Sequence, residues 1–328
     1  MHRLSEDDYV DGVLRGDRTV LARAITLAES SRPDDQHLAR NVLDRVVTRS
    51  GSSIRVGISG VPGVGKSTLI DRLGCLLDDA GHRVAVLAVD PSSQVSGGSI
   101  LGDKTRMEGL SHRANAFVRP SPTSGTLGGV ARKTREAMLL CEAAGFDVVL
   151  VETVGVGQSE ATVAEMVDLF VLLLLPGGGD ELQGIKRGIL ERADLIVINK
   201  ADGPLKPVAE RTRRDYAAAL HTLPGTRSGR QVMTVSATEG HGVEDIWTAV
   251  GAMRDERLAS GDWQRQRDAQ RLRWLWSAIE DGIHDALHRD PALREAVERA
   301  ERDVSSGRVA PTRAADAVLA RLLGRAPG

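Results

Sequence analysis

The chain has 328 residues, and its 43 lysines and arginines nearly balance 45 aspartates and glutamates, for a formal net charge of −2. This balance argues against a protein that binds nucleic acid or another polyanion through overall charge. Its length allows one sizeable nucleotide-binding domain with additions. The two cysteines, Cys75 and Cys141, lack the spacing of a disulfide framework or a zinc site.

Two segments bear on location. Residues 1–8 are acidic and polar, unlike the basic start of a secretory signal. The apolar run at 169–175 is too short to cross a bilayer and is closed by Pro176 and three glycines. We therefore expect a cytoplasmic protein with no membrane partner.

The chain begins with a predicted helical extension. Residues 18–47 carry apolar side chains at helical spacing on either side of Ser31-Arg32-Pro33. A flexible Ser/Gly junction follows at 50–53. We assign residues 1–50 to this N-terminal extension.

The central part alternates apolar strands with helices, which is the pattern of a parallel sheet covered on both faces. The predicted strands lie at 54–59, 84–89, 148–152, 169–175, 195–199 and 232–236. Together they predict an α/β domain with a mainly parallel central sheet flanked by helices, which we assign to residues 51–254.

Residues 255–328 change to charged helical sequence and are predicted to form a C-terminal arm. Leu272, Leu275, Ile279, Ile283 and Leu287 form an apolar stripe at helical spacing. Three of the four tryptophans also fall here. Such side chains pack either against another subunit or against the chain's own domain, and the sequence leaves both open.

The first motif with chemistry follows the first predicted strand. Residues 60–67, GVPGVGKS, satisfy GxxxxGK[ST] between a strand and a helix, the signature of a P-loop nucleotide-binding fold. In such a loop backbone N–H groups wrap phosphates, Lys66 reaches the β and γ phosphates, and Ser67 ligates Mg²⁺. The expected phosphate-binding residues are Gly60, Gly63, Val64, Gly65, Lys66, Ser67 and Thr68.

The second motif selects the base. Asn199-Lys200-Ala201-Asp202 ends a predicted strand and resembles the NKxD sequence of GTPases. The carboxylate of Asp202 can accept hydrogen bonds from the guanine ring N–H and amino group, which adenine cannot supply. Asn199 would brace the pocket and Lys200 would pack along the base. Ser236-Ala237-Thr238 resembles the SAx loop, and we expect the N–H of Ala237 to meet the guanine carbonyl oxygen.

Carboxylates near the phosphate loop predict a magnesium site. Glu152 ends a strand and is followed by Gly155, resembling DxxG with Glu for Asp, so Glu152 should serve Mg²⁺ and Gly155 the γ-phosphate. Asp90 and Asp103 lie where a first switch loop would approach the metal. Either one could instead stabilise a turn.

The residue that positions the attacking water is not evident. No glutamine directly follows Gly155, so hydrolysis is expected to be slow without a partner. The glycine-rich segment 176–186 could deliver Gln183 or Lys186 to the nucleotide. It could equally be an ordinary loop that starts a helix.

Several of these segments together resemble one family of GTPases. They are GVPGVGKST, LAVDPSS with SGGSILGDKTRM behind it, VETVGVGQSE, LLPGGGDELQGIKRGILE and INKAD. This combination closely resembles the MeaB/ArgK family, and the match covers nearly the whole chain.

The resemblance implies a homodimeric metallochaperone-type GTPase that assists an adenosylcobalamin-dependent acyl-CoA mutase, most often methylmalonyl-CoA mutase. It implies magnesium and switch roles for Asp90, Asp103 and Glu152, a third switch region at 177–189, and a dimerising arm. Two alternatives are a GTPase for nickel-enzyme maturation and a transport-associated kinase. The chain lacks the His-rich tail and Cys-His cluster expected of the first, and Asp202 disfavours the ATP required by the second.

Overall fold

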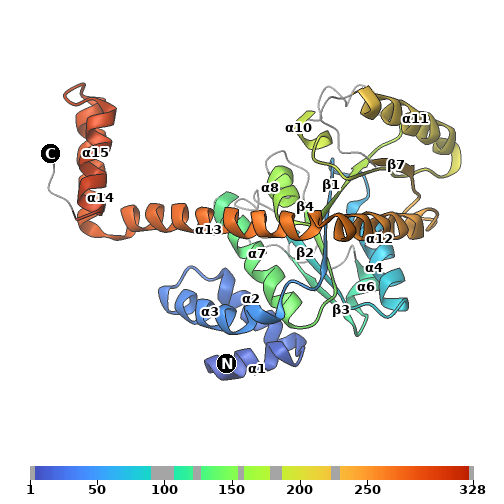
Figure 1. Ribbon diagram of the computed structural model, residues 1–328, viewed down its shortest axis with the longest axis horizontal. Helices are drawn as coiled ribbons and strands as arrows, with labels where there is room; N and C mark the ends of the chain where they lie inside the picture. The colour runs from blue at the N-terminus through green and yellow to red at the C-terminus, as the bar shows by residue number, and fades with distance from the viewer. Residues whose placement is uncertain are drawn as a thin grey trace. The chain divides into compact units, whose positions relative to one another are not determined.

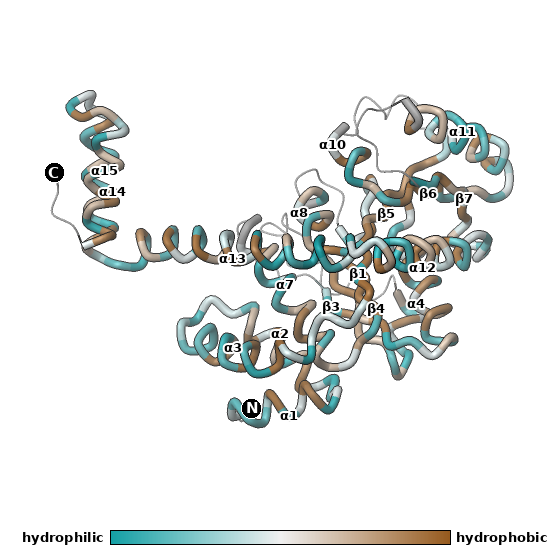
Figure 2. The backbone as a smooth tube through the Cα atoms, viewed as in Figure 1, coloured by the Kyte–Doolittle hydropathy of each residue, from teal (hydrophilic) through white to brown (hydrophobic). Residues whose placement is uncertain are grey.

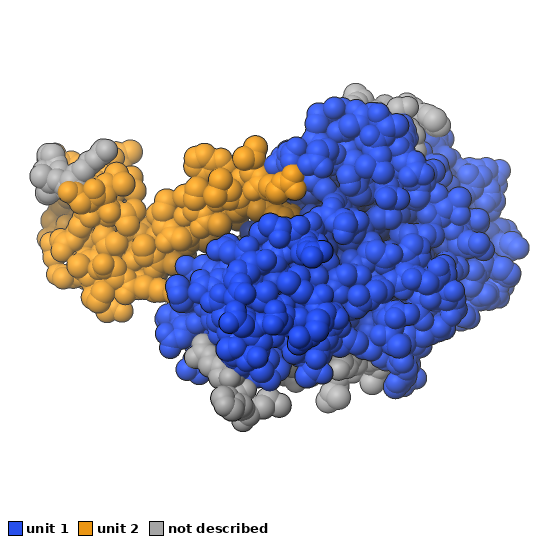
Figure 3. Space-filling model, turned by 60° about the horizontal axis from the view of Figure 1, so that its bottom comes forward, with its two compact units in different colours: residues 1–270 blue, residues 271–328 orange. Residues whose placement is uncertain are grey.

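The computed structural model describes residues 4–89, 107–120, 127–153, 159–177, 187–222 and 230–324. By compactness the chain divides into two units, residues 1–270 and 271–328, which Figure 3 colours blue and orange. The division predicted from sequence, with boundaries after residues 50 and 254, remains a prediction. Each unit is described by itself below.

The first unit is built on one sheet. Within the described residues seven strands pair in the order β3-β2-β4-β1-β5-β6-β7, and every pairing is parallel. The strands are β1 (Ile54–Gly60), β2 (Val84–Val89), β3 (Ala116–Arg119), β4 (Val148–Thr153), β5 (Leu169–Leu174), β6 (Leu195–Ile198) and β7 (Gln231–Thr234). The α/β fold with a parallel central sheet is therefore confirmed.

The composition of the strands explains this architecture. Each of β1, β2, β4, β5 and β6 is buried along its whole length, which requires cover on both faces of the sheet. Figure 2 shows these strands as the hydrophobic centre of the unit. Parallel neighbours need crossover connections, and most of the crossovers here run through helices (Figure 1).

Helices connect and cover the strands. In the first unit they are α1 (Glu6–Leu14), α2 (Arg18–Glu29), α3 (Pro33–Val46), η1 (Val47–Arg49), α4 (Lys66–Asp79), α6 (Glu108–Ser111), α7 (Leu127–Ala143), α8 (Ser159–Met166), α10 (Arg187–Leu190), η2 (Gly203–Leu205), α11 (Lys206–Thr222) and α12 (Val243–Ser260). The long helix α13 (Asp262–Arg289) begins in this unit and ends in the second.

The two faces of the sheet carry different helices. Alternate residues of β1, such as Val56 and Ile58, join one core cluster with residues of α4 and α12. Gly57, on the opposite face, lies against Val163 and Val167 in and just after α8. Helix α7 also contacts β2 and β4 and packs against α8, while α1, α2 and α3 pack against α7. The N-terminal helices thus form an outer layer on the α7 face.

Buried ion pairs join the start of α13 to the amino ends of the strands. Arg267 forms two hydrogen bonds with Asp168, at 2.8 and 2.6 Å, and its guanidinium also meets the carbonyl groups of Gly51 and Ser53. Beside it Arg55 pairs with Glu142 at 2.7 and 2.8 Å. All four charged side chains are almost fully buried, so each depends on its partner for stability in the folded chain.

The second unit contains the end of α13, α14 (Pro291–Ser305) and α15 (Pro311–Leu322). Of its described residues only Leu293 and Ala314 are buried. Four residues of the predicted stripe on α13, Leu272, Leu275, Ile279 and Ile283, are exposed instead, and so is Trp276 beside them. These five residues, each 40 to 63% exposed, form the exposed stripe. None of the helices that the structure describes is long and apolar enough to cross a membrane.

Candidate functional site: a phosphate loop and a base-binding corner

The phosphate loop lies where β1 ends and α4 begins. Gly60 ends the strand, Gly65 caps the helix with φ 97°, and Lys66 is the first helical residue. The Lys66 Nζ atom donates to the carbonyl oxygens of Gly60 at 2.8 Å and Val61 at 3.2 Å, so the ammonium group lies across the loop. The strand–loop–helix geometry that phosphate binding requires is therefore present.

Two of the loop's glycines are required by close neighbours. A Cβ atom at Gly65 would lie 2.5 Å from Nδ2 of Asn199, and one at Gly60 would lie 2.5 Å from the carbonyl oxygen of Leu173. Both residues also have φ between +90° and +155°, where other side chains are strained. Glycine therefore lets the loop sit directly against β5 and against the predicted base motif.

A hydroxyl and a carboxylate meet at the start of α4. The Ser67 Oγ atom donates to Oε1 of Glu152 at 2.8 Å, although 85 residues separate them in sequence. Glu152 stands at the end of β4, next to β1, and is 7% exposed. A hydroxyl and a carboxylate oxygen are hard ligands of the kind that Mg²⁺ prefers, so this pair fits the predicted metal site.

Asn199 of the base motif contacts both the phosphate loop and the loop after β7. Its Nδ2 donates to the carbonyl oxygen of Val64 in the phosphate loop at 2.8 Å, and its Oδ1 accepts from the N–H of Ala237 at 3.1 Å. Asn199 is 1% exposed. One buried side chain thus holds the phosphate loop and the loop after β7 together.

Asp202 is oriented by the same loop. The Ser236 Oγ atom donates to Oδ2 of Asp202 at 2.6 Å and accepts from the N–H of Glu239 at 3.1 Å. Lys200, between Asn199 and Asp202 in the sequence, is exposed and has φ 58°, the one positive φ of a non-glycine residue in the described chain. Such strained backbone persists where its surroundings enforce it, often at binding sites. This turn places Asn199 and Asp202 beside the loop after β7.

The N–H of Ala237 has a different hydrogen-bond partner from the predicted one. The sequence predicts that it donates to guanine, whereas here it donates to Asn199. A guanine carbonyl oxygen would have to share or replace that bond. The proposed contact of Ala237 with the base therefore remains a prediction.

Two contacts at the site were not indicated by any sequence motif. The Thr153 Oγ1 atom donates to Ser59 Oγ at 2.9 Å, with both residues fully buried, and this bond ties the end of β4 to β1. The Arg72 side chain of α4 donates to the carbonyl oxygen of Thr238 at 3.1 Å. Both are long-range contacts between common residue types, so no local pattern could have revealed them.

The remaining predicted site residues fall into two groups. Gly63 and Thr68 lie in the phosphate loop and in the first turn of α4. Asp90, Asp103, Gly155, Gln183 and Lys186 lie outside the described residues. The roles proposed for those five residues remain predictions.

The fold and the site define a P-loop GTPase, because a phosphate loop, a hydroxyl–carboxylate pair and an Asn-Lys-x-Asp corner meet at the carboxyl ends of parallel strands. The family described as "Methylmalonyl Co-A mutase-associated GTPase MeaB" matches residues 21–292. The chain belongs to this family, and it is a GTPase.

Similar proteins extend over nearly the full length. A Caulobacter vibrioides protein with the name "Putative GTPase" is 56% identical over 97% of this chain and 98% of its own. The mouse "Methylmalonic aciduria type A homolog, mitochondrial" is 48% identical over 96% of this chain and 80% of its own. A crystal structure described as "LAO/AO transport system kinase" is 36% identical, with a TM-score of 0.76 and coverage of 98% of this chain and 99% of its own.

Proposed function

We propose that this GTPase is a chaperone of an adenosylcobalamin-dependent acyl-CoA mutase, most simply methylmalonyl-CoA mutase, whose cofactor loading it gates and which it protects from inactivation. The observation that carries the proposal is the match of residues 21–292 to a family described by its association with that mutase. A GTPase suits such a task because its nucleotide state can change its contacts with a client.

Magnesium fits the site through the described pair. Ser67 and Glu152 would hold the ion, and Asp90 and Asp103 are proposed as further ligands or switch residues. A bound Mg²⁺ neutralises phosphate charge during hydrolysis. Lys66 would bind the β and γ phosphates, while Asp202 would select guanine. The absence of a glutamine directly after Gly155 supports slow hydrolysis in the absence of the client.

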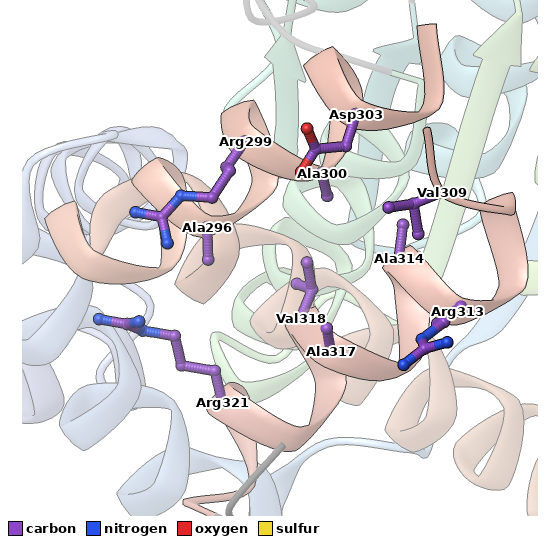
Figure 4. A pocket seen from close by; sticks show the side chains of 10 residues that line it. All are labelled: Ala296, Arg299, Ala300, Asp303, Val309, Arg313, Ala314, Ala317, Val318 and Arg321. Carbon is purple, nitrogen blue, oxygen red and sulfur yellow. The ribbon is translucent and has the colours of Figure 1, made fainter. Parts of the chain in front are cut away.

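A homodimer is proposed from the second unit. With two buried residues in its described part, this unit has almost no core of its own, and helices of this kind gain stability by burying apolar surface against a partner. The exposed stripe on α13 is one such surface. Alanine and valine side chains lie between α14 and α15, with Arg299, Arg313 and Arg321 around them, in a groove of about 370 Å³ (Figure 4).

The dimer proposal has a direct test. Trp276→Glu places a charge on the exposed stripe and is expected to shift the mass measured by light scattering toward a monomer. Leu205→Glu, at an exposed apolar residue of η2, is the control. An unchanged dimer in the Trp276 variant, or a monomeric wild-type chain, would contradict the proposal.

The client is tested by measuring GTP turnover and adenosylcobalamin loading of purified mutases with and without the chain. Stimulated turnover and nucleotide-dependent loading are expected with at least one cobalamin-dependent mutase of the source organism. Asp202→Asn provides a matched control, because it should respond to XTP instead of GTP. Unchanged turnover and loading with every such mutase would rule out the proposed client.

A transport-associated kinase is the alternative suggested by the description of the 36% identical structure. The oriented carboxylate of Asp202 favours guanine over adenine, which supports GTP as the nucleotide. Incubation with radiolabelled ATP and candidate acceptor proteins distinguishes the two functions. Transfer of phosphate to an acceptor at a rate above GTP hydrolysis would favour the kinase.

A further inference from the structure

A groove runs along β3, the strand at one edge of the sheet. It has a volume of about 730 Å³ and is lined by α2 on one side, by α6 and the residue after it on the other, and by β3 itself. Figure 1 shows β3 between α2 and α6. Since β6 and β7 lie at the opposite end of the strand order, this edge groove is separate from the base-binding corner.

Two arginine contacts bound the edge groove. Arg18, at the start of α2, donates through Nη1 to the carbonyl oxygens of Arg113 at 3.1 Å and Ala114 at 3.4 Å. Arg119 of β3 pairs with Glu29 and donates to the Thr26 hydroxyl at 3.1 Å. These contacts hold α2 beside β3, and the edge groove lies between the helix and the strand.

Basic side chains outnumber acidic ones in the lining of the edge groove. The lining includes three arginines and one histidine but a single carboxylate, Glu108; the basic residues are Arg18, Arg23, Arg119 and His112. Arg119 is neutralised by Glu29, whereas Arg18 meets backbone carbonyls and no carboxylate of the described chain. The α2 wall is therefore suited to acidic groups.

The floor of the groove is apolar and follows the edge strand. Phe117 and Val118 of β3 and Ala22 of α2 line it. As an edge strand, β3 pairs only with β2 among the described strands, and every second residue of such a strand turns its N–H and C=O groups away from the sheet. Ala116 and Val118 are these residues, and the N–H of Ala116 already donates to the carbonyl oxygen of Arg113 at 3.4 Å, so the C=O of Ala116 and both groups of Val118 remain for pairing. An extended segment could pair with these groups.

The two walls lie on opposite faces of the sheet. Helix α2 packs against α7, whereas α6 packs against α4, and α7 and α4 cover opposite faces. The side chains of an added strand would point alternately to α2 and to α6. Acidic groups at every second position would then all face the arginines of α2.

We propose that the edge groove binds an extended acidic segment of a partner protein by strand addition to β3. A free phosphate or a small polyanion would meet the arginines but leave the apolar floor and the backbone edge unused. An extended peptide uses all three features. The proposal concerns a surface outside the nucleotide site and does not depend on the identity of the client.

Binding can be measured with the full-length chain in GDP and a fluorescein-labelled peptide of four Glu-Val repeats, followed by fluorescence anisotropy. The wild type is expected to bind, with affinity that falls as salt rises. Arg18→Glu should weaken binding at least tenfold, and Ala22→Trp, which fills the groove without changing charge, should do the same. Arg254→Glu, on an exposed part of α12, is the matched control and should bind like wild type. Unchanged GDP affinity in all variants shows that they are folded.

Strand addition has its own control. A peptide of the same sequence with every backbone amide N-methylated keeps its charge but has no N–H groups to donate to β3, so it should bind at least tenfold more weakly. Equal binding of the methylated peptide would overturn strand addition. Wild-type affinity in both the Arg18 and Ala22 variants would overturn the site, as would displacement of the peptide by a short oligonucleotide or tripolyphosphate at equal concentration.

Discussion

Asn199→Ala would test whether one buried side chain organises the nucleotide site. Asn199 forms two hydrogen bonds, to the carbonyl oxygen of Val64 and from the N–H of Ala237, and all three residues are at most 3% exposed. Each buried backbone group left without a partner costs about 1–3 kcal/mol. The substitution should therefore destabilise this region by about 2–6 kcal/mol. GTP binding has to restore the order of this region in the variant. If that cost equals only one lost hydrogen bond, GTP affinity still falls about tenfold.

Two measurements separate the consequences of this substitution. Titration with a fluorescent GTP analogue reports GTP affinity, and urea unfolding reports stability. Asn199→Asp is the comparison, because its carboxylate can still accept from Ala237 but repels the carbonyl oxygen of Val64, so it isolates one bond. Affinity within threefold of wild type for Asn199→Ala would refute the reasoning, whether or not stability changes.

Three further predictions follow from the described contacts. Asp202→Asn should weaken GTP binding and raise affinity for XTP, as measured by competition; unchanged affinities for both would show that Asp202 does not contact the base. Arg267→Met leaves the carboxylate of Asp168 buried without its charged partner and should lower the free energy of unfolding by about 3–5 kcal/mol in urea titrations. Burial acts to raise the pKa of Glu142, but hydrogen bonding to Arg55 and its charge outweigh burial and hold that pKa below its ordinary value. The stability from this lowered pKa is present above the unfolded-state pKa and is lost as pH falls through the folded one, so Glu142→Gln should flatten the dependence of unfolding free energy on pH below about 4.5.

Most of the sheet could be predicted because its strands are apolar along their whole length. The six predicted strands are all present, each within a residue or two of its expected ends. The strand that was missed, β3, has four residues and includes Arg119, so its apolar run is too short to stand out from a loop. Helix α1 lies inside the predicted helical extension at 1–50 but was not recognised as a separate helix, although Ser5 and Asp8 form a capping box that signals its start.

The site was predictable where chemistry demands a local motif. Phosphate binding needs glycines, a lysine and a hydroxyl in one loop, and guanine recognition needs a carboxylate at a strand end, so Lys66 and Asp202 stand out in sequence. The contact between Thr153 and Ser59 has no such signature, because two hydroxyls in separate strands meet only after the sheet forms. The partner of the Ala237 N–H was likewise decided by packing.

Asn199 links the predicted base motif to the phosphate loop in a way that motif spacing does not express. Its contact with Val64 lies inside the phosphate loop, and its contact with Ala237 lies in the loop that also carries Ser236, the residue that orients Asp202. Displacement of either loop would strain the other through a side chain with no room to move, since Gly65 already lies against it. A bound guanine would thus stabilise the phosphate loop as well as its own pocket. Discrimination against adenine would then affect the order of the phosphate site and not only the number of hydrogen bonds to the base.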